Sequence, residues 1–128
     1  MSINLDTVSK NFTTPCYAYD FDAIKNRLIS LRKKLNKNID LLYAMKSNPN
    51  PFLLKAISKY VDGVDISSLG EMELASKQGL DPMNFSFAGP GKTENDLIGA
   101  LRGKCGILSV ESIDELNRLA KLENKIDF

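Results

Sequence analysis

A single lysine at the end of an apolar stretch is the residue best placed to do chemistry in this sequence. Lys46 follows residues 41–45 (LLYAM), and Asn48-Pro49 then interrupts the segment. If the segment is a strand, Lys46 shares a face with Ala44 and Asn48. Both faces of a parallel sheet are covered, so a lysine buried there would favour its neutral amine, a nucleophile for carbonyl compounds. The alternative is a lysine whose charged end reaches water from the strand end.

The composition argues against several classes of function. The 128 residues are 43% hydrophobic and 26% charged, as in an ordinary globular domain, and the formal net charge is +1. No basic stripe indicates nucleic acid, and no segment is typical of a signal peptide or a membrane span, so we expect neither partner. The chain has no histidine, and Cys16 and Cys105 form no metal-binding pair, so we expect no metal site. This cysteine usage is typical of a reduced, cytoplasmic protein.

Strand-like and helix-like segments alternate along the chain. Residues 1–15 are expected to be irregular. The expected strands are residues 16–19, 41–48, 63–67, 84–88, 107–110 and 126–128. The expected helices are residues 21–35, 50–60, 70–79 and 93–102, and one that begins after Ser112. Ser112 and Glu115 have capping-box spacing in that last helix. Its apolar face is expected to consist of Ile113, Leu116, Leu119 and Ala120.

This alternation predicts a parallel sheet with crossover helices. The sheet could be an open doubly wound one or part of a (β/α)8 barrel. A complete barrel needs about 200 to 250 residues, and this chain supplies roughly half. We therefore expect a fragment of a larger structure.

Polar residues are expected at the carboxyl ends of three successive strands, where parallel sheets hold their active sites. Lys46 ends one strand, Asp65 and Ser67 share a face of the next, and the loop 89–91 (GPG) follows the third. Each has a simpler explanation, because Asp65 could cap its strand and Ser67-Ser68 could cap the following helix. Taken together, they predict a polar cluster around Lys46.

Residues 89–93 (GPGKT) also suggest a phosphate-binding loop. That motif requires glycine at position 86, where this chain has Ser86, and the loop has too few glycines to hold a triphosphate. We therefore expect an ordinary turn, or a close approach of the backbone to a ligand.

Several of these segments resemble one enzyme family. Residues 43–48 (YAMKSN) resemble the Y-A-x-K-x-N segment of the fold-type III pyridoxal-phosphate enzymes, which include alanine racemase and the ornithine and diaminopimelate decarboxylases. Residues 65–71 (DISSLGE) resemble the D-x-x-S-x-G-E stretch of the decarboxylase branch, and residues 14–20 (TPCYAYD) and 87–92 (FAGPGK) are similar to that branch too. The motifs follow one another in the family's order, so each supports the others.

The resemblance implies an α/β fold in which residues 21–128 form about the first half of an alanine racemase-like (β/α)8 barrel. Residues 1–20 would be a lead-in with a strand that pairs with a β-domain absent from this chain. The implied cofactor is pyridoxal 5'-phosphate, held by Lys46 as a Schiff base. Lys46 would be the catalytic residue, Asp65 would lie beside it and the cofactor, and Glu71 would support them. The implied cofactor-binding residues are Lys46, Asp65, Ser67 and Glu71, with no metal.

The implied function is decarboxylation of an amino acid by the parent protein, on a substrate like diaminopimelate, ornithine or arginine, or on a carrier-protein-tethered one. The resemblance also implies a homodimer. The family's phosphate loop, its acidic partner of the pyridine nitrogen and its ring-stacking histidine would lie beyond residue 128, so the fragment alone is expected to be inactive. An amino-acid racemase of the same fold and a non-catalytic pyridoxal-phosphate-binding or regulatory homologue are alternatives. So is a generic α/β domain with a chance lysine.

Overall fold

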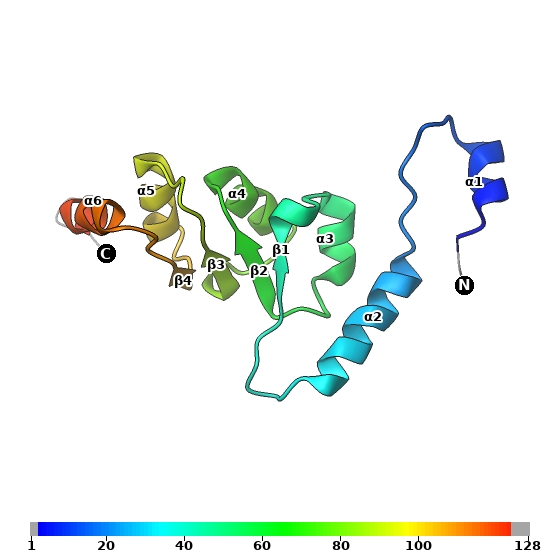
Figure 1. The fold of residues 1–128 in the computed structure, drawn as a ribbon, viewed down its shortest axis with the longest axis horizontal. Helices are drawn as coiled ribbons and strands as arrows, with labels where there is room; N and C mark the ends of the chain where they lie inside the picture. The colour runs from blue at the N-terminus through cyan, green and yellow to red at the C-terminus, as the bar shows by residue number, and fades with distance from the viewer. Residues whose placement is uncertain (1–2, 124–128) are drawn as a thin grey trace. The chain divides into compact units, whose positions relative to one another are not determined.

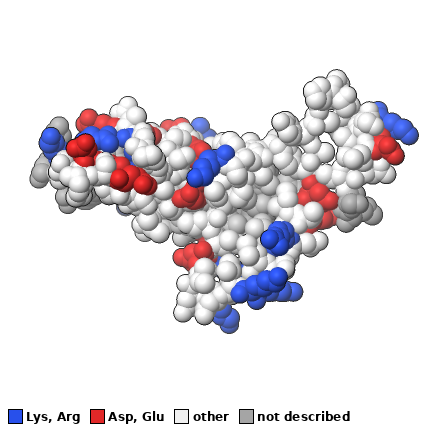
Figure 2. Space-filling model, viewed as in Figure 1, with Lys and Arg blue, Asp and Glu red and all other residues white. Residues whose placement is uncertain are grey.

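The computed structural model of the protein describes residues 3–123. The chain divides into two compact units, the first ending at Ile39 and the second beginning at Asp40. The first unit holds two helices, α1 (Leu5–Asn11) and α2 (Phe21–Lys34). Asp20 caps α2, because its side chain accepts a 2.9 Å hydrogen bond from the backbone N–H of Ala23. The last turn of α2 is basic, as expected for a helix carboxyl end, and Figure 2 shows blue side chains in this region.

Two expectations for the first unit are wrong. Residues 1–15 are not irregular throughout, because α1 forms where the Asn4 side chain accepts a 3.1 Å hydrogen bond from the backbone N–H of Thr7. The strand expected at residues 16–19 does not form in the described chain. A strand needs a neighbour to pair its backbone N–H and C=O groups, and no described strand lies beside this segment.

The second unit is a four-stranded parallel sheet with its connecting helices (Figure 1). Its strands are β1 (Leu42–Ala44), β2 (Gly63–Ile66), β3 (Phe85–Phe87) and β4 (Ile107–Leu108). Its helices are α3 (Pro51–Ile57), α4 (Leu69–Lys77), α5 (Glu94–Arg102) and α6 (Ile113–Glu123). Each strand lies beside the next one along the chain, in the order β1-β2-β3-β4. This sequential order is that of a β/α barrel, whereas a doubly wound sheet reverses its order at a switch point.

One face of this sheet is well covered and the other is not. Val64, Ile66, Phe85 and Phe87 alternate along β2 and β3 and are each at most 1% exposed. They form a core with residues of the 3-10 turn η1 (Met45–Ser47) and of the helices, namely Met45, Leu54, Met72, Ala75 and Ala100. On the opposite face Asp65 pairs in register with Ala44 and Ser86, and all three are only half-buried. In the part of the chain that the structure describes, this second face is left open, as the inner face of an incomplete barrel would be.

The last helix buries a different face from the one expected. Ile113 and Leu116 are 73% and 50% exposed, whereas Leu122 and Glu115 are buried. The expectation was wrong because α6 packs against α5 and the loop before it, and those contacts select the side of α6 that carries Glu115. The strand expected at residues 126–128 lies outside the described residues. Between residues 3 and 123, no helix combines the length and apolar content needed to cross a membrane.

Candidate active site

Lys46 lies on a turn just beyond the first strand. β1 ends at Ala44, and the chain then makes a 3-10 turn from Met45 to Ser47, closed by a 3.1 Å hydrogen bond from the backbone N–H of Asn48 to the carbonyl of Met45. Met45 is fully buried, while Lys46 is exposed. The expectation that the strand continues through Lys46 is therefore wrong, and of the two environments left open for this lysine the structure does not show the buried one. The alternative, a charged end that reaches water, agrees with the structure.

The turn that carries Lys46 is held by its neighbours' side chains. The Tyr43 hydroxyl donates a 2.9 Å hydrogen bond to the carbonyl of Asn48, across the whole turn. The Ser47 hydroxyl lies 2.7 Å from the carbonyl of Ala44 and 3.1 Å from the Tyr43 oxygen. The Asn50 side chain then caps α3 by accepting from two backbone N–H groups. Lys46 is thus an exposed amine on a fixed backbone.

The end of β2 carries the next group of expected site residues. Asp65 sits on the open face of the sheet, one strand over from Ala44, and is half-buried. Beyond it, one Glu71 carboxylate oxygen accepts hydrogen bonds from both the backbone N–H (2.7 Å) and the hydroxyl (3.1 Å) of Ser67. Of the two serines that could cap the next helix, Ser68 caps α4 by accepting from the backbone N–H of Glu71. Ser67 and Glu71 therefore satisfy each other.

Asp96 ties the start of α5 to the start of α4. One of its oxygens accepts from the backbone N–H of Leu69 at 2.8 Å, and the other accepts from the backbone and hydroxyl of Thr93 in a capping box. Burial acts on this carboxyl most strongly and would raise its pKa. The hydrogen bonds from Thr93 and Leu69, with the charge of Lys92, outweigh burial together and hold the pKa of Asp96 below its usual range.

The lysine of the GPGKT segment is not available to bind a phosphate. The Lys92 amine is 3.0 Å from a carboxylate oxygen of Glu115, and the two side chains are 0% and 1% exposed. The same amine donates to the carbonyl of Gly89, so the loop closes on itself. The Gly89–Lys92 loop is thus a packed structural turn, with its positive charge already neutralised.

Sequence reasoning did not identify this buried pair. The Ser112–Glu115 spacing did draw attention to Glu115, and half of the expected box is present, since the Glu115 backbone N–H bonds the Ser112 hydroxyl at 3.1 Å. The Glu115 side chain, however, pairs with Lys92. A capping-box signal read along one helix gives no sign of a partner one β/α unit away.

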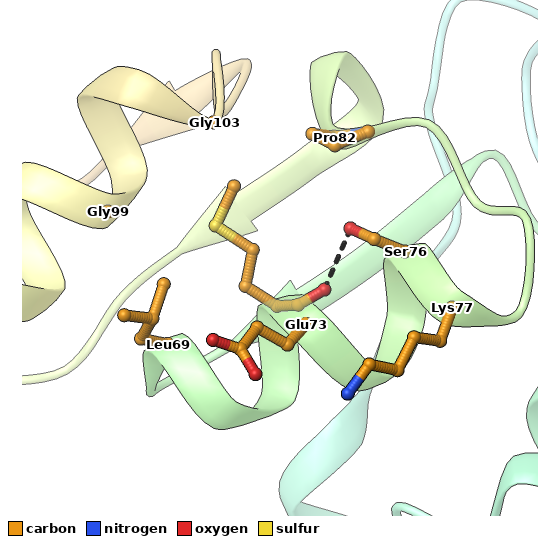
Figure 3. A pocket seen from close by; sticks show the side chains of 8 residues that line it. Leu69, Glu73, Ser76, Lys77, Pro82, Gly99 and Gly103 are labelled. Carbon is orange, nitrogen blue, oxygen red and sulfur yellow. Dashed lines mark hydrogen bonds between the residues drawn. The ribbon is translucent and has the colours of Figure 1, made fainter.

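An open apolar groove lies between α4 and α5, and none of the candidate site residues lines it (Figure 3). Its cavity volume is about 480 Å³, and Leu69, Gly99 and Gly103 are among the residues that line it. A Cβ at Gly99 would come within 2.4 Å of a Leu69 methyl carbon, so the glycines allow close packing of the two helices. The groove contains neither Lys46 nor Asp65, so it is not part of the candidate site.

Comparison with known proteins identifies the family. Residues 21–128 match the family described as pyridoxal-dependent decarboxylase, pyridoxal binding domain. The chain belongs to this family. It is 36% identical over 124 residues to the diaminopimelate decarboxylase of Aquifex aeolicus, which covers 97% of this chain and 29% of that enzyme. It is also 35% identical over 131 residues to the L-glutamyl-[BtrI acyl-carrier protein] decarboxylase of Niallia circulans, covering 96% of this chain and 31% of the relative.

Solved structures agree with this assignment. The crystal structure of Helicobacter pylori diaminopimelate decarboxylase complexed with L-lysine superposes with a TM-score of 0.83 at 32% identity, covering 95% of this chain and 31% of the other. The chain thus spans about a third of the length of these relatives. The resemblance seen in the sequence and the expected partial α/β barrel are both confirmed, and the family's cofactor is pyridoxal phosphate.

The residues at this edge fit one part of that cofactor. An exposed primary amine on a fixed turn, as at Lys46, suits an aldehyde carbon. Lys92 does not fit a phosphate-binding role, because Glu115 already neutralises it. The assignments of Lys46, Asp65, Ser67 and Glu71 to the cofactor, and the division of the chain at residue 20, stay predictions.

Proposed function

We infer that the parent protein of this chain is a pyridoxal-phosphate-dependent amino-acid decarboxylase in which Lys46 holds the cofactor. The observation that carries this proposal is the exposed amine of Lys46 on a tethered turn, at the carboxyl edge of a family barrel. When bound, pyridoxal phosphate delocalises the electron pair left on the α-carbon as carbon dioxide departs. The protein positions the substrate and transfers protons, and we propose Lys46 as the residue of this chain that transfers them.

The other site residues have supporting parts in this proposal. Asp65 lies on the strand next to β1 and on the open face, so its carboxylate would contribute negative charge near the cofactor. Glu71 accepts both donors of Ser67, so this pair would shape the rim of the site. We assign direct cofactor contact to Lys46 and Asp65 first, and a positioning part to Ser67 and Glu71.

The proposed substrate is a small amino acid, either free or tethered to a carrier protein. The two relatives described above support one form each, since one is named for diaminopimelate and the other for a glutamyl carrier protein. We further propose that the parent is a homodimer in a reducing compartment such as the cytoplasm, with no nucleic-acid or membrane partner. Two free cysteines in the described chain agree with that compartment.

The test is a pair of lysine variants in the full-length parent. Lys46→Ala is expected to abolish the visible absorbance shift on adding pyridoxal phosphate, and with it the release of carbon dioxide. Lys55→Ala, at an exposed lysine on α3, is the matched control and should leave both unchanged. Borohydride reduction followed by peptide mass spectrometry should place the cofactor on Lys46. Retention of both signals in Lys46→Ala would contradict the proposal.

Two further measurements separate the alternatives. A racemase would convert one enantiomer of the amino acid into the other without releasing carbon dioxide. A regulatory homologue would bind pyridoxal phosphate and release none from any amino acid, free or tethered. The 128 residues alone are expected to show no turnover, so assays should use the parent.

A further inference from the structure

The Gly89–Lys92 loop is held from several sides by charged side chains that the proposed mechanism does not use. Besides the Lys92–Glu115 ion pair, the backbone N–H of Gly89 donates a 3.0 Å hydrogen bond to Glu111. Arg118 of α6 donates a 2.9 Å bond to the carbonyl of Lys92. The loop that ends β3 is therefore fastened to the segment that follows β4.

The ion pair at the centre of this arrangement is costly to bury. Among the described residues, Glu115 Oε1 has only the Lys92 amine, 3.0 Å away, as its polar partner, and Oε2 accepts a 3.4 Å hydrogen bond from the backbone N–H of Glu111. Desolvation offsets most of the attraction in such a pair, and apolar residues of similar volume often stabilise a fold equally well or better. A contribution to positioning explains its presence better than a contribution to stability.

The Lys92–Glu115 pair positions Gly89, the residue of the loop that lies beside the candidate site. Gly89 has a φ of +119°, a conformation that residues with a Cβ rarely adopt, and a Cβ there would lie 3.6 Å from the Cβ of Ser67. Ser67 in turn bonds Glu71 at the end of β2. The Lys92 amine bonds the carbonyl of Gly89, and the preceding residue, Ala88, donates from its backbone N–H to the carbonyl of Ile66 at 2.9 Å, so the loop held by Glu115 and Lys92 lies against the chain beside Ser67.

We propose that Lys92 and Glu115 are positioning residues for the cofactor site, which hold the Gly89–Lys92 loop against Ser67. This inference rests on the proposed function, because it assumes that pyridoxal phosphate binds at the edge formed by Lys46, Asp65 and Ser67. Neither residue touches the cofactor in this proposal. Their effect reaches it through the backbone of the loop.

The test uses the full-length parent and the double variant Lys92→Met/Glu115→Met, which removes both charges of the pair together with the hydrogen bonds that the two side chains make to the backbone of Gly89 and Glu111. Backbone hydrogen exchange at Gly89 is expected to speed up in the apoprotein, because the loop has lost its anchor. The dissociation constant for pyridoxal phosphate, from absorbance titration, should rise roughly 10- to 100-fold, the scale of a displaced site group. Lys121→Met, at an exposed lysine of the same helix, is the matched control and should change neither quantity.

A second variant covers the case in which the double variant fails to fold. Arg118→Met removes one bond to the loop and leaves the ion pair intact, so a smaller change in the same two measurements is expected. The inference is overturned if a folded double variant shows wild-type exchange and wild-type cofactor affinity. If the double variant is unfolded, the same result in Arg118→Met overturns it. In either case the proposed function still stands. If the wild-type parent binds no pyridoxal phosphate, the proposed function fails and this inference fails with it.

Discussion

Removal of one hydroxyl group, by Tyr43→Phe, tests whether the turn that carries Lys46 is held as the structure indicates. The Tyr43 hydroxyl donates to the carbonyl of Asn48 at 2.9 Å, and this bond joins the two ends of the turn. Ser47 keeps its own partner in the variant, because its hydroxyl already lies 2.7 Å from the carbonyl of Ala44. The change therefore removes one hydrogen bond and leaves the aromatic ring in place.

The expected magnitude follows from the environment of that bond. Asn48 is half-buried, so its carbonyl regains only part of its hydration, and the loss should cost about 1 to 2 kcal/mol in the free energy of unfolding. If the turn opens in the free variant and must close again to bind the cofactor, the dissociation constant for pyridoxal phosphate should rise by up to roughly 5- to 30-fold, the equivalent of that energy. Both effects share one cause and should appear together.

Urea denaturation and an absorbance titration with pyridoxal phosphate measure the two effects in the full-length parent. Tyr60→Phe is the matched control, because the Tyr60 hydroxyl makes no hydrogen bond with any residue that the structure describes. The control should behave as wild type in both assays. The reasoning is refuted if Tyr43→Phe is as stable as wild type, or if it loses stability while its cofactor affinity stays unchanged.

Three other perturbations have expected outcomes. Gly63→Ala should lower the free energy of unfolding by about 3 kcal/mol, because its Cβ would lie 1.7 Å from the backbone carbonyl oxygen of Asn84. Gly70→Ala is the control and should not destabilise the protein, because no atom lies nearer than 3.9 Å to its Cβ. Equal urea midpoints for the two variants would contradict this prediction. Asp96 has a lowered pKa, so its contribution to stability is complete above its unfolded pKa of about 3.9 and disappears as the pH falls through the folded value. The stability difference between wild type and Asp96→Asn should therefore shrink from pH 7 to pH 3, and a constant difference would count against that charge. The isolated 128-residue chain should self-associate in light scattering, because it exposes apolar side chains such as Ile113 and leaves β1 and β4 as sheet edges in its described part; a stable monomer would argue otherwise.

The order and type of most elements could be predicted from local patterns. Asn50 before Pro51 predicted the start of α3, and Thr93 predicted the start of α5; the structure has a cap at each place. These signals are readable because a helix cap is formed by residues within three or four positions of one another. The same locality limited the prediction for β1, where burial of Met45 and the bond from Tyr43 to Asn48 end the strand two residues before Lys46.

The sequence by itself determined that Lys46 is the reactive candidate and that Asp65, Ser67 and Glu71 follow one β/α unit later, and its resemblance to the pyridoxal-phosphate family implied the barrel and the cofactor. Only the tertiary structure decided that Lys46 is exposed on a tethered turn, that Ser67 and Glu71 satisfy each other, and that Lys92 is neutralised by Glu115. The physical reason is that exposure and charge pairing depend on the register of neighbouring strands and on which side of a helix faces them. The periodicity of apolar residues along one segment predicts neither the strand register nor the side of the helix that faces the sheet.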